Sequence, residues 1–116
     1  MSSQKEFCDR MVRLLNQVAP VTPRAMFGGY GLYAEGVMFA LIAEEILYFK
    51  VDDENRQPYL AAGSGPFIYD RKGKFIQMSY YQLPDVILQD ANQLVTWVDE
   101  ARAAAKRAKQ KRKPKQ

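Results

Sequence analysis

The residues with the clearest chemical potential in this sequence are the basic side chains at its C-terminal end. Residues 101–116 contain eight lysines and arginines and no acidic residue, and seven of these form one run: Lys106, Arg107, Lys109, Lys111, Arg112, Lys113 and Lys115. The whole chain has 17 basic and 13 acidic residues, so 9 basic and 13 acidic residues remain in positions 1–100. A basic run attracts polyanions by counterion release, without any demand for sequence. The charge pattern therefore predicts that these seven side chains bind nucleic-acid phosphates, although a solvated end that only aids solubility has the same composition.

Side chains for acid–base or metal chemistry are scarce. The chain has no histidine and one cysteine, Cys8, which excludes a His-based triad, an intrachain disulfide and a structural zinc site. Nothing near Cys8 in the sequence would lower its thiol pKa, so we interpret it as part of the core. The acidic pairs at 44–45 and 52–53 fall at expected turn and helix-cap positions, where carboxylates serve the local backbone. We therefore expect no enzymatic activity, no metal and no cofactor.

Two glycine-containing patterns are similar to ligand-binding motifs, but neither has the surroundings that such a motif requires. Residues 29–34 match the spacing of the dinucleotide fingerprint, yet no buried strand precedes them and no helix follows. Residues 26–31 are similar to the aromatic strand on which RNA-recognition modules stack bases, but the expected order of elements differs. We interpret Gly28, Gly29 and Gly31 as structural, at positions where a strand bends or is approached closely.

Hydrophobic periodicity predicts the elements that position these residues. We expect a helix over residues 3–18, strands over 30–34, 37–42 and 46–51, a short helix between residues 52 and 63, strands over 67–70 and 75–81 around a turn at 71–74, and a last helix from about residue 90. Residues 37–42 could instead form a short buried helix, because Met, Ala and Leu favour one. The short connections between strands demand antiparallel pairing. The fold class is therefore α+β: two layers, an antiparallel sheet, and the order helix, three strands, helix, two strands, helix.

The length of 116 residues fits one domain with one core. We place this domain at residues 1–102 and expect residues 103–116 to form a basic, disordered tail. No apolar stretch reaches the roughly 20 residues of a membrane span and the polar N-terminus has no signal region, so we expect a soluble, cytoplasmic protein.

The strand over residues 37–42 is apolar without alternation, so both of its faces should be covered. Helices of a two-layer domain cover one face. We expect a homodimer to cover the other, since a symmetric patch pairs with itself. The alternative is that the first helix packs on the face opposite the other two helices.

A run of residues after the first helix matches a known family pattern. The run contains Arg24, Met26, Phe27, Gly28, Gly29 and Gly31, followed by Tyr48, Phe49 and Lys50. With these residues the chain resembles the N-terminal domain of the TfoX/Sxy family, regulators of natural competence (DNA uptake) in bacteria. The resemblance extends to about Ala105 and implies the same order of elements. Full-length members carry a second, C-terminal domain, so the resemblance is to a stand-alone N-terminal domain.

The resemblance also implies a function. It implies a non-enzymatic transcription co-activator that assists the cyclic-AMP receptor protein at competence promoters, and it brings no catalytic residues. Our first hypothesis is a regulatory domain that acts near DNA, in which the acidic body contacts protein and the basic tail contacts phosphate. The second is a homodimeric protein-interaction module with no direct nucleic-acid role.

Overall fold

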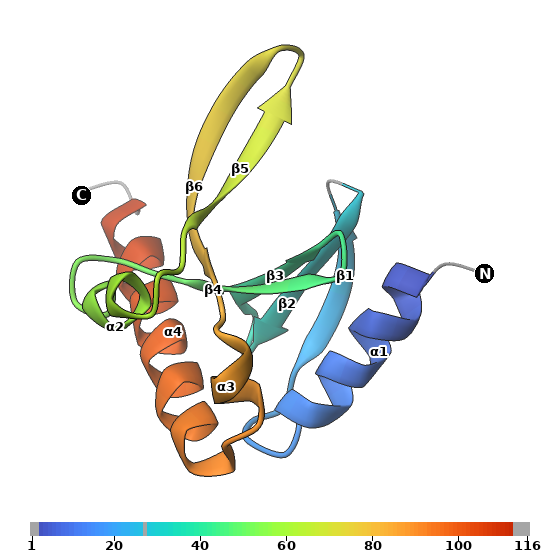
Figure 1. The fold of residues 1–116 in the computed structure, drawn as a ribbon, viewed down its shortest axis with the longest axis vertical. Helices are drawn as coiled ribbons and strands as arrows, with labels where there is room; N and C mark the ends of the chain where they lie inside the picture. The colour runs from blue at the N-terminus through green and yellow to red at the C-terminus, as the bar shows by residue number, and fades with distance from the viewer. Residues whose placement is uncertain (1–2, 27, 113–116) are drawn as a thin grey trace.

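The computed structural model describes residues 3–26 and 28–112 (Figure 1). Within these residues six strands form one antiparallel sheet in the order β1-β2-β3-β4-β6-β5. The elements along the chain are α1 (Ser3–Leu15), β1 (Thr22–Met26), β2 (Gly29–Ala34), β3 (Val37–Ala43), β4 (Ile46–Lys50), α2 (Gln57–Ala61), β5 (Pro66–Arg71), β6 (Lys74–Gln82), α3 (Asp85–Leu88) and α4 (Ala91–Arg112). The predicted α+β class with an antiparallel sheet is confirmed. Of the residues singled out in the sequence, Phe27, Lys113 and Lys115 lie outside the described residues, as does the side chain of Arg112.

One face of the sheet carries the main hydrophobic core. Strand pairing brings one row of buried residues across four strands: Leu32, Ala40, Phe49 and Tyr81. Helices α1 and α4 contribute to the same core through Cys8, Met11, Leu15, Leu94, Val98 and Ala101. Both helices therefore pack on this face.

The opposite face of β3 is covered by side chains of the same chain. Leu41 is only 1% exposed, and its neighbours across the sheet on that face are Gly31 and Tyr48. The Tyr48 ring in turn packs edge-on against Phe67 of β5, with 5.1 Å between centroids. Residues 37–42 thus form a strand, but neither expected cover for its second face is found. Helix α1 shares the core face with α4, and the burial of Leu41 requires no second copy. The homodimer stays a prediction, and the need to cover β3 no longer supports it.

The structure has one strand more before α2 than the sequence predicts. Strand β1 is exposed along almost its whole length, so it has no apolar alternation that would reveal it. Its Pro23 lies opposite Leu32 at the edge of the sheet, where a missing amide hydrogen is tolerated. The single-turn helix α3 is a second addition. The predicted order of helix, three strands, helix, two strands, helix is therefore wrong by these two elements.

The short helix α2 begins at Gln57, later than its acidic N-terminal signal predicts. Residues 52–55 form a turn instead, held by the side chain of Asn55. Its Oδ1 accepts a hydrogen bond from the Asp52 amide at 2.7 Å, and its Nδ2 donates to the Lys50 carbonyl at 3.1 Å. Asn55 is 3% exposed, so both of these side-chain atoms need partners. The carboxylate of Asp52 is thereby presented outward from the end of β4.

Helix α4 begins as predicted and ends later. Asp90 Oδ1 accepts a hydrogen bond from the Gln93 amide at 3.2 Å, and Gln93 Nε2 donates back to Asp90 Oδ2 at 2.8 Å. Residues 103–112 belong to the helix, so this segment is not the disordered tail we expect from its composition. Its alanines are strong helix formers, and two of them, Ala104 and Ala105, are buried. At 22 residues α4 has the length of a membrane span, but no described helix is both long and apolar enough to cross a membrane.

Candidate nucleic-acid interface

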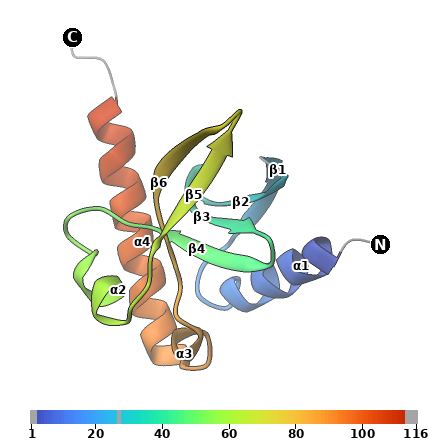
Figure 2. The ribbon, with the colours of Figure 1, turned by 45° about the horizontal axis from the view of Figure 1, so that its top comes forward.

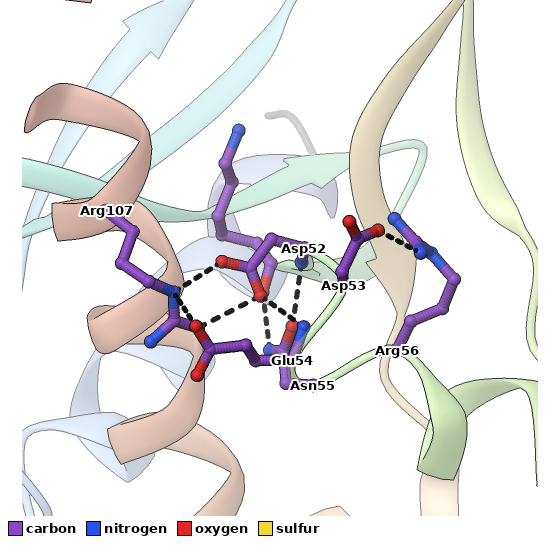
Figure 3. A network of polar contacts seen from close by, with 7 residues as sticks. Asp52, Asp53, Glu54, Asn55, Arg56 and Arg107 are labelled. Atoms are coloured by element: carbon purple, nitrogen blue, oxygen red, sulfur yellow. Dashed lines mark hydrogen bonds and ion pairs between the residues drawn. The ribbon is translucent and has the colours of Figure 1, made fainter. Parts of the chain in front are cut away.

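Arg107 and Asp52 form the centre of a polar network between α4 and the turn after β4 (Figure 3). Arg107 Nε donates to Asp52 Oδ2 at 2.6 Å and its Nη2 donates to Oδ1 at 2.9 Å, which is a bidentate pair. Arg107 Nε also lies 3.3 Å from Glu54 Oε2. The hydrogen bonds from Arg107 hold the pKa of the Asp52 carboxyl below its usual value, and those to Asp52 raise the pKa of Arg107. The side chains of Asp52 and Arg107 are 24% and 30% exposed, so solvent screens this pair only in part.

A second contact joins α4 to the turn between β2 and β3. Glu35 and Gly36 occupy the turn with φ of 53° and 79°, as a tight hairpin turn requires. The Glu35 carboxylate Oε1 lies 3.2 Å from Arg102 Nη2 and 3.8 Å from Lys106 Nζ. Basic side chains of α4 therefore neutralise acids of the body at two separate points.

These contacts divide the predicted phosphate-binding run. Of the seven cations predicted to bind phosphates, Lys106 and Arg107 already form ion pairs with acids of the body. Lys109 and Lys111 lie further along the helix, are exposed, and make no ion pair within the described residues. The cations available to a ligand therefore begin at Lys109.

A groove of about 610 Å³ lies between α4 and the strands, and Lys109 forms part of its wall. Its other walls include Tyr33 of β2 and Tyr80 of β6. Lys50 lines the same groove: its Nζ donates to Ser79 Oγ at 3.0 Å and lies 5.1 Å from the centroid of the Tyr80 ring. The surface beside the end of α4 thus combines lysines with aromatic rings, the combination that holds phosphates and bases in nucleic-acid sites.

The glycines of the family pattern have steric reasons for their identity. A Cβ at Gly29 would lie 2.0 Å from the carbonyl oxygen of Ile42 in the neighbouring strand, a distance that the backbone could not accommodate without shifting. Gly28 adopts a φ of +73°, which residues with a side chain rarely adopt. A Cβ at Gly31 would meet the sulfur of Met26 at 2.6 Å. The close approach and the positive φ both belong to the connection from β1 into β2.

The remaining residues of the pattern point to different sides of the sheet. Phe49 is fully buried in the core, with its ring 5.8 Å from that of Phe39. Its neighbours Tyr48 and Lys50 face the opposite side because side chains alternate along a strand. Burial raises the pKa of Tyr48. Lys50 is the member of this group that reaches the groove beside α4.

Arg24 lies on the edge strand β1, opposite Gly31. Its guanidinium lies 5.4 Å from the centroid of the Tyr33 ring, and Tyr33 lines the groove. Arg24 and Lys50 each therefore stack on an aromatic ring of the groove, Arg24 on Tyr33 and Lys50 on Tyr80.

Two sets of residues in this region are not expected from the sequence. The acids that hold α4, among them Glu35 and Asp52, have only local roles in the sequence pattern, because nothing in that pattern links them to a helix far along the chain. Phe75, beside the basic turn at 71–74, is exposed, but the sequence does not single it out because its spacing is that of an ordinary hairpin strand. Within the described part of the chain, no three His, Cys, Asp or Glu side chains are grouped so as to hold a metal ion.

Comparison with known proteins places the chain in a family. The sequence model of the TfoX N-terminal domain matches residues 13–105. Over 93 residues the chain is also 25% identical to the DNA transformation protein TfoX1 of Aliivibrio fischeri, an alignment that covers 80% of this chain and 44% of that protein. The chain thus spans less than half the length of this relative, and the basic end of α4 from Lys106 onward lies beyond the family match. Because that match covers most of the sequence, the chain belongs to the TfoX N-terminal domain family.

Proposed function

We propose that this protein is a non-enzymatic regulatory domain of bacterial competence that acts at DNA, with the basic end of α4 as its phosphate-binding element. Membership of the TfoX N-terminal domain family and a relative named a DNA transformation protein support the regulatory role. The observation that supports DNA contact is the division of charge along α4. Arg107 fixes the helix to the body, whereas Lys109 and Lys111 extend beyond it without an acidic partner among the described residues.

The anchored helix gives these cations a structural advantage. A disordered basic tail loses conformational entropy when it settles on a phosphate backbone, whereas side chains on a preformed helix lose less. The sequence places five cations from Lys109 to the end of the chain. If all five contact duplex DNA, they should contribute about −4 to −5 to the slope of the logarithm of the affinity against the logarithm of the salt concentration.

The experiment is a fluorescence-anisotropy titration of a fluorescein-labelled mixed-sequence DNA duplex at several salt concentrations. Deletion of residues 109–116 should lower the affinity strongly and reduce the magnitude of the salt slope by about 4 to 5, the value for five lost phosphate contacts, with little change in melting temperature because the Arg107 anchor remains. Arg13→Ala, which removes an exposed cation of α1, is the matched control and should bind like the unmodified protein. Undiminished binding after the deletion, or binding that does not depend on salt, would contradict the proposal.

We further propose that a transcription factor, such as the cyclic-AMP receptor protein, contacts the surface of α3 and α4 away from the basic end. Val86 and Val95 on these helices are 67% and 42% exposed, and the nearby Asp99 and Glu100 are also exposed. Exposed apolar residues bordered by charges are typical of protein interfaces. In a pull-down with the purified receptor protein, Val86→Asp should abolish capture, whereas the same change at the exposed Leu60 of α2 should leave it unchanged.

The homodimeric interaction module is the second candidate. Its support is the position of β5, which is the last strand in the order of the described sheet, since an edge strand can pair with the same strand of another copy. Sedimentation equilibrium distinguishes the two states. A single species near 13.3 kDa at micromolar concentration would contradict the dimer.

A further inference from the structure

Strands β5 and β6 extend beyond the rest of the sheet as a two-stranded arm (Figures 1 and 2). Strand β6 pairs with β4 only through residues 80–82, whereas it pairs with β5 along residues 74–77. Among the described strands, none pairs with the arm as a third strand, and residues 70–77 are all exposed. A two-stranded ribbon without a third strand is only marginally stable by itself. Because residues 70–77 are exposed, their side chains are available to a ligand.

The tip of the arm is strongly basic. Lys72 and Gly73 form the turn, with φ of 53° and 85°, and Asp70 Oδ1 accepts a hydrogen bond from the Gly73 amide at 3.1 Å. Arg71 and Lys74 flank the turn. Within the described residues none of the three cations makes an ion pair. Lys106 and Arg107, by contrast, form ion pairs with the carboxylates of Glu35 and Asp52.

Apolar side chains are exposed on both faces of the arm, directly behind this tip. Strand pairing places Ile68 and Phe75 on one face, as diagonal neighbours that are 47% and 74% exposed. Ile76, which is 41% exposed, lies on the other face. A flat protein surface could cover only one of these faces. The groove of a nucleic-acid duplex encloses a two-stranded ribbon from both sides and has phosphates along both of its rims.

We propose that this arm is a second nucleic-acid contact, which enters a groove of duplex DNA. Phe75 packs against the sugars and base edges in the groove, and Arg71, Lys72 and Lys74 bind the phosphates at its rims. The inference rests on the proposed function, because it adds a contact to the same DNA. In both views the arm and the C-terminal end of α4 point toward the same end of the molecule, so one duplex can meet both (Figures 1 and 2).

The arm can be tested with the same labelled duplex, two arm variants that remove side chains, and one conservative substitution. Phe75→Ala should weaken binding at least about fivefold, because stacked or packed aromatic side chains contribute strongly to nucleic-acid affinity. Phe75→Tyr should keep most of the affinity. The triple variant of Arg71, Lys72 and Lys74 to alanine should reduce the magnitude of the salt slope by about 3, the value expected for three lost phosphate contacts. Leu60→Ala, a truncation of an exposed side chain on α2, and Arg13→Ala are the matched controls. All positions are exposed, so equal melting temperatures should confirm that each variant folds.

The outcomes separate the arm from the helix end. Affinity lost in both arm variants and kept in the controls supports the inference, whether or not deletion of residues 109–116 also weakens binding. Loss only on that deletion, with both arm variants within twofold of the unmodified protein, overturns the arm and leaves the proposed function in place. No DNA binding by the unmodified protein overturns both. A change in sedimentation mass for Phe75→Ala, with DNA affinity unchanged, would show that the arm binds a second copy instead and would overturn the inference.

Discussion

The ion pair between Arg107 and Asp52 is expected to hold the last turns of α4 on the body, and a double-mutant cycle can measure its strength. Arg107→Met removes the guanidinium while keeping an unbranched side chain with good helix propensity. Asp52→Asn removes the negative charge but leaves an oxygen that can accept the 3.0 Å hydrogen bond from the Glu54 amide. Arg107→Met also removes the ion pair with Glu54, but this loss is common to both sides of the double-mutant cycle and cancels in the coupling energy. The free energy of unfolding of the two single variants, the double variant and the unmodified protein, from urea denaturation, gives the coupling energy.

The geometry sets the magnitude. A solvated surface pair contributes about 0–1 kcal/mol, whereas a hydrogen bond to a charged group that is partly buried contributes about 1.5–3 kcal/mol. The pair has two short hydrogen bonds, at 2.6 and 2.9 Å, but both side chains keep about a quarter to a third of their surface in solvent. We therefore expect a coupling energy of about 1–2 kcal/mol between Arg107 and Asp52. Loss of this energy should lower the melting temperature of a domain this size by several degrees. Lys111→Met on the same helix, as control, should change stability by less than about 0.5 kcal/mol.

The coupling should depend on pH in one direction. Hydrogen bonds from Arg107 lower the pKa of Asp52 in the folded state below its ordinary value of 3.8. Stabilisation by this carboxylate is therefore fully present above pH 3.8 and is lost as pH falls through the lowered folded pKa. The same coupling at pH 7 and pH 5 is expected, with a decrease only in stronger acid. A coupling below about 0.3 kcal/mol at neutral pH, or equal effects of Arg107→Met and Lys111→Met, would refute the anchoring role.

Three further predictions concern the interior and the glycine turn. Gly29→Ala should lower the free energy of unfolding by about 2 kcal/mol or more, since its Cβ would lie 2.0 Å from the Ile42 oxygen. Gly28→Ala should lower it by about 1 kcal/mol, because Gly28 has a positive φ but open surroundings. Urea denaturation that reverses this order would contradict the steric explanation. Tyr59→Phe should leave the stability unchanged or raise it, because the buried Tyr59 hydroxyl has no hydrogen-bond partner among the described residues, and a loss above about 1 kcal/mol would show that the hydroxyl is bound. Burial raises the pKa of the Cys8 thiol, so a thiol reagent at pH 8 should label native protein far more slowly than urea-unfolded protein, and equal rates would show an accessible thiolate.

Elements whose local sequence and environment agree could be predicted. Helix α1 carries its apolar residues at helical spacing because one face meets the core, and the hairpin of β5 and β6 is marked by the basic turn that contains Gly73. The capping pair of Asp90 and Gln93 needs only neighbours in the chain, so the start of α4 was also predictable. Strand β1 was not predictable, because an edge strand that faces solvent needs no apolar alternation. It is held in the sheet by its antiparallel pairing with β2.

The burial of β3 shows the same limit on a larger scale. Its unbroken apolar run correctly indicates that both faces are covered, but the identity of the cover is a property of the folded sheet. Leu41 is buried among side chains of neighbouring strands, with the Tyr48 and Phe67 rings in contact beside it. The path of β5, which brings Phe67 to Tyr48, depends on the pairing of β6 with β4, and that pairing joins residues thirty or more positions apart, such as Phe49 and Tyr81.

The sequence by itself determined the chemistry available to this protein: a basic C-terminal run, an acidic body, no imidazole, and a pattern of glycines that identifies the family. Tertiary structure alone decided which of these charges remain available to a ligand. Arg107 and Asp52 are 55 positions apart, and Lys106 reaches Glu35 only because α4 packs across β3. Composition counts a charge wherever it lies in the chain. The interaction energy of a basic side chain with a phosphate, however, depends on the other charges that the fold places within a few ångströms of that side chain, because Coulomb interactions weaken with distance and are screened by solvent.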